Sequence, residues 1–341
     1  MNSWDVWGQD RLVTELQTGF PGAIRHASII SGPEMSGKSL LATCLAKALL
    51  CLEPPRPGEF CGSCRACRGI DRGIHPDVSR FDLATQAETG SGSGKAQQSL
   101  SIDTVRDVSR NVTLRPVEGD WRVVIVDDVE TMQETAQEAF LKTLEEPPDL
   151  TVLLLLTTDA NALLPTILSR SVVLRMQTAT AAEIAERLVD SGIDTEVAEE
   201  TAYLAQGLPG WALRAVRDPS LRESRSREVR EILEWIRADR YQRMVMAISQ
   251  ADTFSSDKDA VFGKLQLLLL GWRSEMLRYL GVPDSKSLFA GSSSEHPAVA
   301  GIDDFTRALK SIGQCIFDLE SNVRPRLAMQ SMVSRWPEMR S

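Results

Sequence analysis

The sequence lacks an apolar run long enough to cross a membrane. Its longest runs, at residues 152–156 and 265–270, fall far short of the roughly 20 residues that a spanning helix requires. The N-terminus carries charge early and has no long apolar core, so no signal peptide is visible. We therefore expect a cytoplasmic protein that makes no membrane contact.

The chain also lacks an excess of positive charge. Lys and Arg together number 38 against 47 for Asp and Glu, which gives a net charge of −9. Such a balance argues against a large sequence-independent DNA-binding face on this chain alone. Any DNA contact is expected to be local or shared with partner subunits. The length of 341 residues allows two or three domains.

A phosphate-binding pattern, G-x-x-x-x-G-K-[ST], runs from Gly32 to Ser39. It lies between a short apolar strand at 27–30 and a helix expected to begin near Lys38. Gly32 and Gly37 allow the backbone to turn several N–H groups toward one anion, and the helix N-terminus adds partial positive charge. Lys38 would reach the β- and γ-phosphates of ATP or ADP, and Ser39 would bind Mg²⁺. The alternative is an ordinary glycine-rich turn with an incidental lysine.

An acidic pair, Asp127 and Asp128, follows the β-branched run at 123–126. That run suits a central parallel strand that is buried on both faces. Its carboxyl end is where open α/β sheets place their ligands. We expect Asp127 to organise the Mg²⁺ held by Ser39 and Asp128 to polarise a water. Thr158, after the next strand, is also assigned to the nucleotide site. The alternative is a pair of acids that begins a surface turn.

A cysteine cluster lies within one short segment, in a chain without export signals. Its four thiols are enough for a closed tetrahedral Zn²⁺ site with a structural role. An iron–sulfur cluster and four independent free thiols are the alternatives. The members are Cys51, Cys61, Cys64 and Cys67.

Strand and helix patterns alternate as far as residue 176, which predicts an α/β fold with a parallel, doubly wound sheet. After Thr178 only helices are expected. Residues 84–98 and 281–297 are predicted to be mobile connections because they are rich in small polar residues. The expected strands are 27–30, 78–82, 123–126, 151–156 and 172–176.

Two acids, Glu145 and Glu146, lie in the last turn of the helix that starts near Thr131 and stops at Pro147-Pro148. Negative charge at a helix C-terminus opposes the helix dipole. Local helix stability therefore does not explain these acids.

Together these motifs resemble those of the AAA+ clamp-loader subunits of bacterial DNA polymerase III. The resemblance implies a P-loop base with a five-stranded parallel sheet at 1–177, including a zinc-binding insertion at 51–67. A small helical lid at 178–217 and an all-α collar at 218–341, which assembles a five-subunit ring, are implied after it. The stretches that carry the resemblance are the P-loop, the cysteine cluster, residues 139–148, Leu168-Ser169-Arg170 and residues 322–328.

Within that family the chain looks most like the delta-prime type, which helps to open the sliding clamp and load it on primed DNA. Gly210 stands where the motor subunits carry an arginine, and Asp128 is one methylene shorter than their glutamate. Only seven residues precede Gly8, and the chain ends with the collar. The intact P-loop keeps nucleotide binding in the expectation, but intrinsic ATPase activity is expected to be weak or absent.

The resemblance also implies that Arg170 serves in trans as an arginine finger for a neighbouring ATP site. The implied partners are gamma/tau-type and delta-type subunits, the sliding clamp and, through the complex, primed DNA. The alternative is that this chain is itself an ATP-hydrolysing gamma/tau-type motor subunit.

Overall fold

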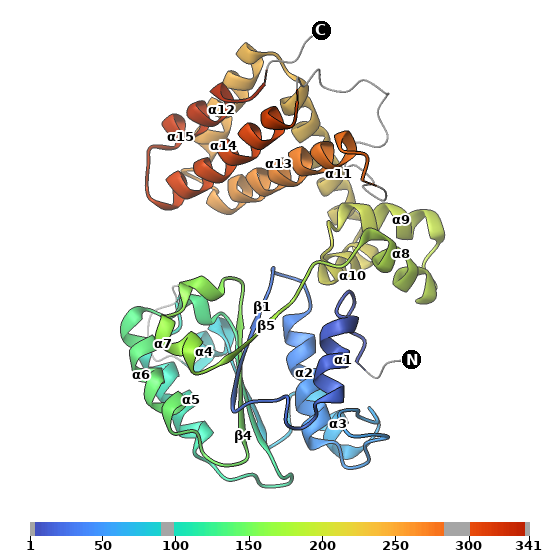
Figure 1. The fold of residues 1–341 in the computed structure, drawn as a ribbon, viewed down its shortest axis with the longest axis vertical. Helices are drawn as coiled ribbons and strands as arrows, with labels where there is room; N and C mark the ends of the chain where they lie inside the picture. Colours follow the sequence, from blue (N-terminus) through green and yellow to red (C-terminus); the bar gives the residue numbers. More distant parts are fainter. Residues whose placement is uncertain (1–3, 90–98, 283–300, 338–341) are drawn as a thin grey trace. The chain divides into compact units, whose positions relative to one another are not determined.

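The computed structural model of the chain describes residues 4–89, 99–282 and 301–337, and the chain divides into two units (Figure 1). The first is Met1–Leu213 and the second is Arg214–Ser341. Most of the predicted connection at 281–297 lies outside the described residues. Within the described ranges, no helix has both the length and the apolar character that a membrane crossing needs. The division of the first unit into base and lid stays a prediction.

The first unit contains a five-stranded sheet in the order β2-β3-β4-β1-β5. All its strand pairs are parallel, and Ile29 of β1 lies opposite both Leu155 and Val173. The predicted α/β fold with a five-stranded parallel sheet is thereby confirmed. The strands are β1 (Ala27–Ser31), β2 (Val78–Phe81), β3 (Arg122–Val126), β4 (Thr151–Thr157) and β5 (Val172–Arg175).

The central strands form because their apolar residues are buried on both faces. Every residue of β3 and β4 is buried. Helices α1 and α2 pack on one face of the sheet, and α5, α6 and α7 pack on the other (Figure 1). The helices of this unit are α1 (Asp10–Thr18), α2 (Lys38–Leu50), α3 (Arg65–Asp71), α4 (Leu83–Thr89), α5 (Ile102–Val112), α6 (Glu134–Glu145), α7 (Pro165–Ser169), α8 (Ala181–Asp190), α9 (Thr195–Leu204) and α10 (Pro209–Arg217), with 3₁₀ turns η1 (Val129–Thr131) and η2 (Ala160–Ala162).

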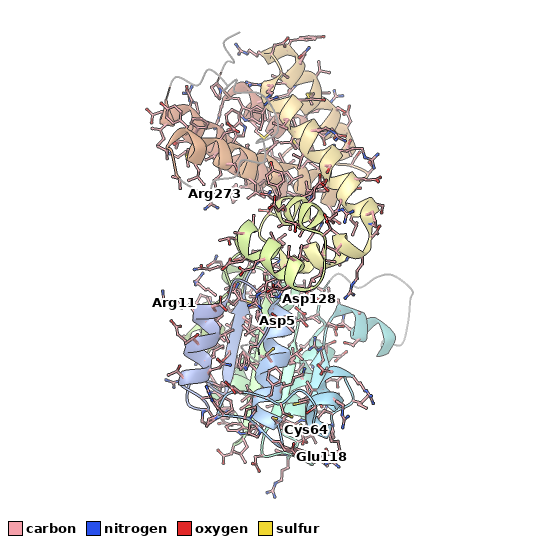
Figure 2. All side chains as sticks on the ribbon, turned by 90° about the vertical axis from the view of Figure 1, so that its right-hand side faces the viewer. Asp5, Arg11, Cys64, Glu118, Asp128 and Arg273 are labelled. Atoms are coloured by element: carbon pink, nitrogen blue, oxygen red, sulfur yellow. The ribbon has the colours of Figure 1, made fainter. Side chains whose placement is uncertain are left out.

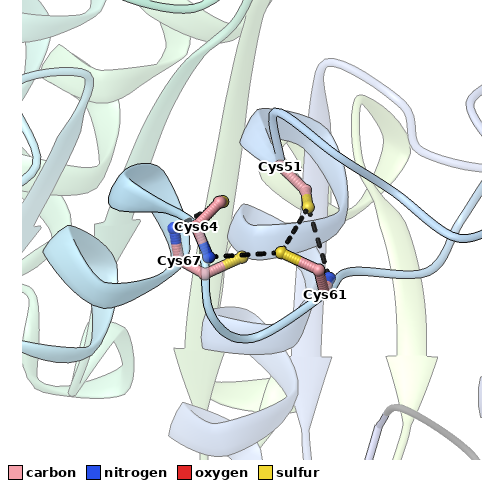
Figure 3. Close-up of side chains that lie close together, drawn as sticks. All are labelled: Cys51, Cys61, Cys64 and Cys67. Carbon is pink, nitrogen blue, oxygen red and sulfur yellow. Dashed lines mark hydrogen bonds between the residues drawn. The ribbon is translucent and has the colours of Figure 1, made fainter.

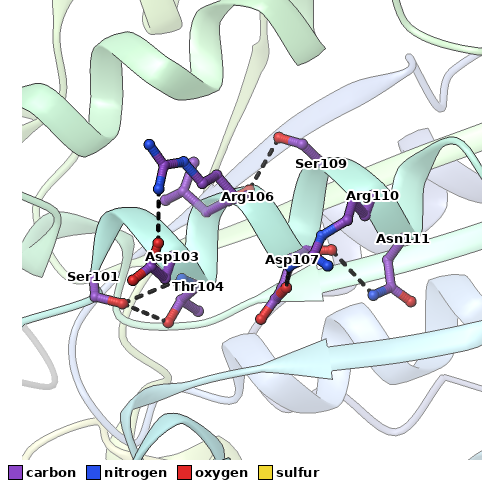
Figure 4. Close-up of polar contacts among 9 residues, drawn as sticks. Ser101, Asp103, Thr104, Arg106, Asp107, Ser109, Arg110 and Asn111 are labelled. Carbon is purple, nitrogen blue, oxygen red and sulfur yellow. Dashed lines mark hydrogen bonds and ion pairs between the residues drawn. The ribbon is translucent and has the colours of Figure 1, made fainter. Parts of the chain in front are cut away.

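Helix α5 illustrates how local sequence sets an element's start (Figure 4). The Ser101 side chain accepts a hydrogen bond from the Thr104 amide at 3.2 Å, which satisfies one of the free N–H groups of the first turn. Val105, Val108 and Val112 are buried along one face. The predicted helix from about residue 102 is confirmed.

The prediction of a loop over 84–98 is wrong at its beginning, where α4 forms. The amide of Thr85 donates to the Asp82 carboxylate at 2.7 Å, and the Asp82 amide donates to Thr85 Oγ1 at 3.0 Å. This reciprocal cap resembles a capping box and starts the helix. The Gly, Ser and Gln content of the segment predicts a loop, but it does not register this local cap. Residues 90–98 lie outside the described part.

Asp77 fixes the start of β2 to the loop before β3. The Asp77 side chain is fully buried, and its carboxylate accepts hydrogen bonds from the amides of Val117, Glu118 and Gly119 at 2.6, 2.8 and 2.8 Å. Burial alone would raise the pKa of Asp77, but these three N–H groups outweigh it and hold the pKa below its usual value.

The second unit is built from helices around an aromatic core. Trp272 is fully buried, and its ring lies 5.7 Å from Trp336 and 6.1 Å from Phe305. Arg243 is also buried and donates to the carbonyl of Pro337 at 2.7 Å. These contacts join Trp336 to α13 and Pro337 to α12. The helices are α11 (Pro219–Arg237), α12 (Arg240–Thr253), α13 (Lys258–Tyr279), α14 (Ile302–Glu320) and α15 (Pro325–Ser334).

Candidate functional site

The loop between β1 and α2 has the backbone geometry that a phosphate cradle needs. Gly32 donates its amide to the Thr157 carbonyl at 3.1 Å, and a Cβ there would lie 2.9 Å from the Cβ of Met176. Gly37, with φ of +99°, starts α2 in the left-handed region that glycine enters readily. No acid lies in the first turn of α2, and no side chain caps it. Its amides therefore suit an anion.

Lys38 folds back onto the same loop. Its ammonium donates to the carbonyls of Gly32 and Pro33 at 2.9 and 3.0 Å, and the side chain is buried. Burial lowers the pKa of Lys38, and the charges of Asp127 and Glu130 oppose that shift. To reach a bound phosphate, the ammonium would exchange two neutral carbonyls for a charged oxygen, which is the stronger acceptor.

Ser39, the predicted Mg²⁺ ligand, contacts a residue that the sequence analysis did not select. One Arg80 Nη donates to Ser39 Oγ at 2.5 Å, and the other donates to Thr43 Oγ1 at 3.0 Å. Arg80 comes from β2, opposite Ile125 of β3. The P-loop thus fits a nucleotide's phosphates, whereas a guanidinium at the Ser39 hydroxyl does not fit a Mg²⁺ ion held there.

The acidic pair lies where β3 ends. The Asp128 amide donates to the Asp127 carboxylate at 3.0 Å. Burial raises the pKa of Asp127, against the opposing effects of that hydrogen bond and of the Lys38 and Arg80 charges. Burial also raises the pKa of Asp128, and the neighbouring charge of Asp127 adds to the shift. Both predicted acids therefore lie at the carboxyl end of β3, in a partly buried site near Lys38.

Glu130 is a further acid at this site, and it holds the predicted site residue Thr158. One Glu130 carboxylate oxygen accepts from the Thr158 amide at 2.9 Å and from its hydroxyl at 2.5 Å. The second carboxylate oxygen is buried and has no partner among the described residues. Glu130 was missed because only the acids directly after the strand were considered.

Gly210, at the start of α10, touches the P-loop. Its amide donates to the Met35 carbonyl at 2.9 Å. A Cβ on Gly210 would lie 2.9 Å from that carbonyl oxygen and 3.1 Å from the Met35 side chain. Since backbone atoms line this contact, any larger residue at 210 requires α10 or the loop to move.

Arg170 lies near the start of β5, just after α7. The P-loop follows the end of β1, and the two strands are parallel neighbours. Arg170 therefore lies at the amino end of its strand, whereas Lys38 follows the carboxyl end of the neighbouring strand β1, so the two residues are at opposite ends of the strands. The Arg170 guanidinium pairs with the Glu145 carboxylate of α6 at 2.7 Å and donates to the Thr166 carbonyl at 3.0 Å. Its side chain is 36% exposed.

The predicted metal-binding cysteines gather in one cluster (Figure 3). Their sulfur atoms all lie within 4.8 Å of one another. In a tetrahedral Zn²⁺ site the sulfurs are about 3.8 Å apart, which follows from Zn–S bonds of about 2.3 Å. The donor set therefore fits Zn²⁺. The members are Cys51, Cys61, Cys64 and Cys67.

Backbone amides point at these sulfurs in succession. The amide of Cys61 donates to Cys51 Sγ, that of Cys64 to Cys61 Sγ and that of Cys67 to Cys64 Sγ, at 3.3 to 3.4 Å. The Ser63 amide is the largest cause that lowers the pKa of Cys61 to about 6. Burial raises the pKa of Cys51 and of Cys67. Amide donors of this kind stabilise thiolates, the form that binds a metal.

The cysteine cluster is remote from the acidic pair. Figure 2 shows Cys64 and Glu118 at one end of the sheet-containing part of the first unit and Asp128 at the other. Glu118 pairs with Arg65 at 3.1 Å and so ties the cluster's helix α3 to the loop held by Asp77. The cysteines therefore lie away from the P-loop.

The strand order and the P-loop after β1 define an AAA+-type α/β protein. The sequence profile of the family described as "DNA polymerase III, delta subunit" matches residues 8–180, half of the chain. The chain belongs to this family of DNA polymerase III clamp-loader subunits.

Individual relatives are also subunits of DNA polymerase III. The chain is 29% identical to the delta-prime subunit of Pseudomonas aeruginosa over 329 residues, which cover 92% of each chain. It is 33% identical to the tau subunit of Escherichia coli K12 over 201 residues, 59% of this chain. The match spans only 29% of that tau protein. Among solved structures, a gamma-subunit-related protein of Thermotoga maritima aligns over 95% of both chains, with 17% identity and a TM-score of 0.36.

Proposed function

We propose that this chain is a delta-prime-type subunit of the DNA polymerase III clamp loader. In this role it joins gamma/tau-type and delta-type subunits in a five-subunit ring, which opens the sliding clamp and places it on primed DNA. The match to a delta-prime subunit over 92% of each chain supports this type, because the match to the tau protein covers less than a third of that protein's length.

The chain binds ATP or ADP at residues 32–39 but hydrolyses it slowly or not at all. Binding is supported by the conformation of the loop and by the uncapped first turn of α2. Slow hydrolysis is supported by Gly210, which leaves no space beside Met35 for an arginine. The competing function is an ATP-driven gamma/tau-type motor, which the intact P-loop favours. A steady-state ATPase assay of the isolated chain separates the two.

The cysteine cluster holds one structural Zn²⁺. Four sulfur ligands close the coordination shell, so no position is left for a substrate. The metal would order the segment between α2 and α3.

Arg170 serves as an arginine finger for the ATP site of a neighbouring subunit. The observation that carries this role is its position at the amino end of the strands, opposite the end that carries the chain's own Lys38, with the guanidinium part-exposed. An arginine supplied by a neighbour stabilises the charge that develops on the transferred phosphoryl group. Such a finger contributes on the order of 10³-fold or more to the rate.

The test uses the complex reconstituted with wild-type partner subunits. Arg170→Ala is expected to leave ring assembly intact and to lower clamp- and DNA-stimulated ATPase activity in part, since several sites share the turnover. Clamp loading should fall further. Arg170→Lys should rescue poorly because lysine lacks the planar fork that grips two phosphate oxygens.

The matched control is Arg106→Ala, which removes an exposed arginine of α5 that pairs with Asp103 on its own helix. It should load clamps at the wild-type rate. If Arg170→Ala does so as well, Arg170 is not a finger.

A further inference from the structure

The contacts of Arg80 put a fixed positive charge at the part of the P-loop where a divalent cation would bind. Its two Nη atoms donate to the hydroxyls of Ser39 and Thr43, which lie one turn apart on α2. Thr43 in turn donates to the Ser39 carbonyl at 2.7 Å. These two hydroxyl acceptors hold Arg80 at a defined place, although its side chain lies at the surface.

The sheet register directs Arg80 to this place. Arg80 lies opposite Ile125, whose side chain belongs to the core on the α2 face. Side chains alternate along a strand, so Asp127 follows Ile125 toward the same face. The Arg80 charge lowers the pKa of Asp127, against the larger effect of burial, which is consistent with this proximity.

A guanidinium and a Mg²⁺ ion compete for this position. Mg²⁺ requires near-octahedral oxygen ligands at about 2.0–2.1 Å. Arg80 donates a hydrogen to the hydroxyl oxygen that the ion would use, and its own charge repels a second cation. A guanidinium carries five N–H donors in a planar fork, and the two contacts to α2 leave others for phosphate oxygens.

We propose that Arg80 replaces Mg²⁺ at this P-loop, so that the chain binds a nucleoside di- or triphosphate equally well with and without the ion. This inference rests on the proposed nucleotide binding at residues 32–39. It also gives a reason for slow turnover, because the phosphates are neutralised by a group that cannot bridge the β- and γ-phosphate oxygens as Mg²⁺ does in hydrolytic P-loop sites.

The experiment measures ADP and ATP affinity of the full chain by calorimetry, in EDTA and in millimolar Mg²⁺. The wild-type dissociation constant is expected to differ by less than about 3-fold between the two conditions. Arg80→Ala should bind about 10-fold or more weakly in EDTA, since a charge-assisted contact is lost. Added Mg²⁺ should restore much of that loss.

Three companion variants complete the design. Arg80→Lys keeps a charge and should bind in EDTA more tightly than Arg80→Ala. Lys38→Ala should weaken binding in both conditions. Arg11→Ala, which removes an exposed arginine paired with Glu15 on α1, should match the wild type. Circular dichroism establishes that each variant is folded.

The outcomes separate this inference from the proposed function. Wild-type binding that depends strongly on Mg²⁺, or an Arg80→Ala variant that binds as the wild type does in EDTA, overturns the replacement but leaves nucleotide binding intact. Binding that appears only after Arg80 is removed also overturns it, because Arg80 then blocks the site. No binding by any variant in either condition removes the proposed nucleotide site itself.

Discussion

The ion pair between Arg170 and Glu145 permits a quantitative prediction about the finger. Both side chains are well exposed, at 36% and 50%, so water screens the contact. A pair of this kind contributes about 0.2–1 kcal/mol. A finger contributes on the order of 10³-fold in rate, or about 4 kcal/mol. Glu145 therefore positions Arg170 but cannot account for its effect.

Glu145→Ala is accordingly expected to slow clamp loading by no more than about 5-fold, the rate equivalent of about 1 kcal/mol. Glu145→Gln, which keeps an acceptor for the guanidinium, should recover part of that loss. The measurements are single-turnover ATP hydrolysis and clamp loading by the reconstituted complex. Glu138→Ala, an exposed acid on the same helix, is the control.

Two results would refute this reasoning. A loss as large as that of Arg170→Ala would mean that Glu145 takes part in the neighbouring site directly. A faster complex would mean that the ion pair restrains Arg170 instead of positioning it.

Two further predictions concern the first unit. Cys64→Ser should abolish stoichiometric zinc binding, measured by elemental analysis of reduced protein, and should leave the helicity of residues 214–341 unchanged. Wild-type protein that contains no zinc after purification would contradict the metal assignment. The depressed pKa of Asp77 means that its stabilisation is complete above the unfolded value of about 3.9 and is lost as pH falls through the lower folded value. Asp77→Asn should therefore lower the free energy of unfolding by about 2–4 kcal/mol at neutral pH. The measurement is hydrogen exchange of the β3 amides, which should be faster in the variant, and the difference from the wild type should shrink in acid. An equal difference at all pH values would exclude the carboxylate as the cause.

The sheet could be predicted from sequence because its strands are short apolar runs separated by clear helical patterns. β3 and β4 are buried at every position, so periodicity and burial agree. The P-loop and the cysteine cluster were found because each is a compact pattern whose spacing already limits its geometry. The order of the strands, in contrast, depends on contacts between distant segments.

The features that were not predicted depend either on contacts between distant segments or on a local capping pattern. Arg80 reads as an ordinary strand residue until the register with β3 turns it toward Ser39. The stability of α6 does not explain the acids at its C-terminus. Glu145 instead forms an ion pair with Arg170, which lies 25 positions later in the sequence. The cap at Asp82 was local and could have been found, because an aspartate three residues before a threonine can start a helix.

The contact between Gly210 and Met35 has a consequence for how such a subunit can change over generations. A glycine codon becomes an arginine codon by a single base change, so an arginine at this position is one mutation away. At Gly210 that mutation would drive a Cβ to within 2.9 Å of a backbone carbonyl. This single change would therefore damage the fit between α10 and the loop. An arginine at 210 could be accommodated only if the loop at Met35 changed as well.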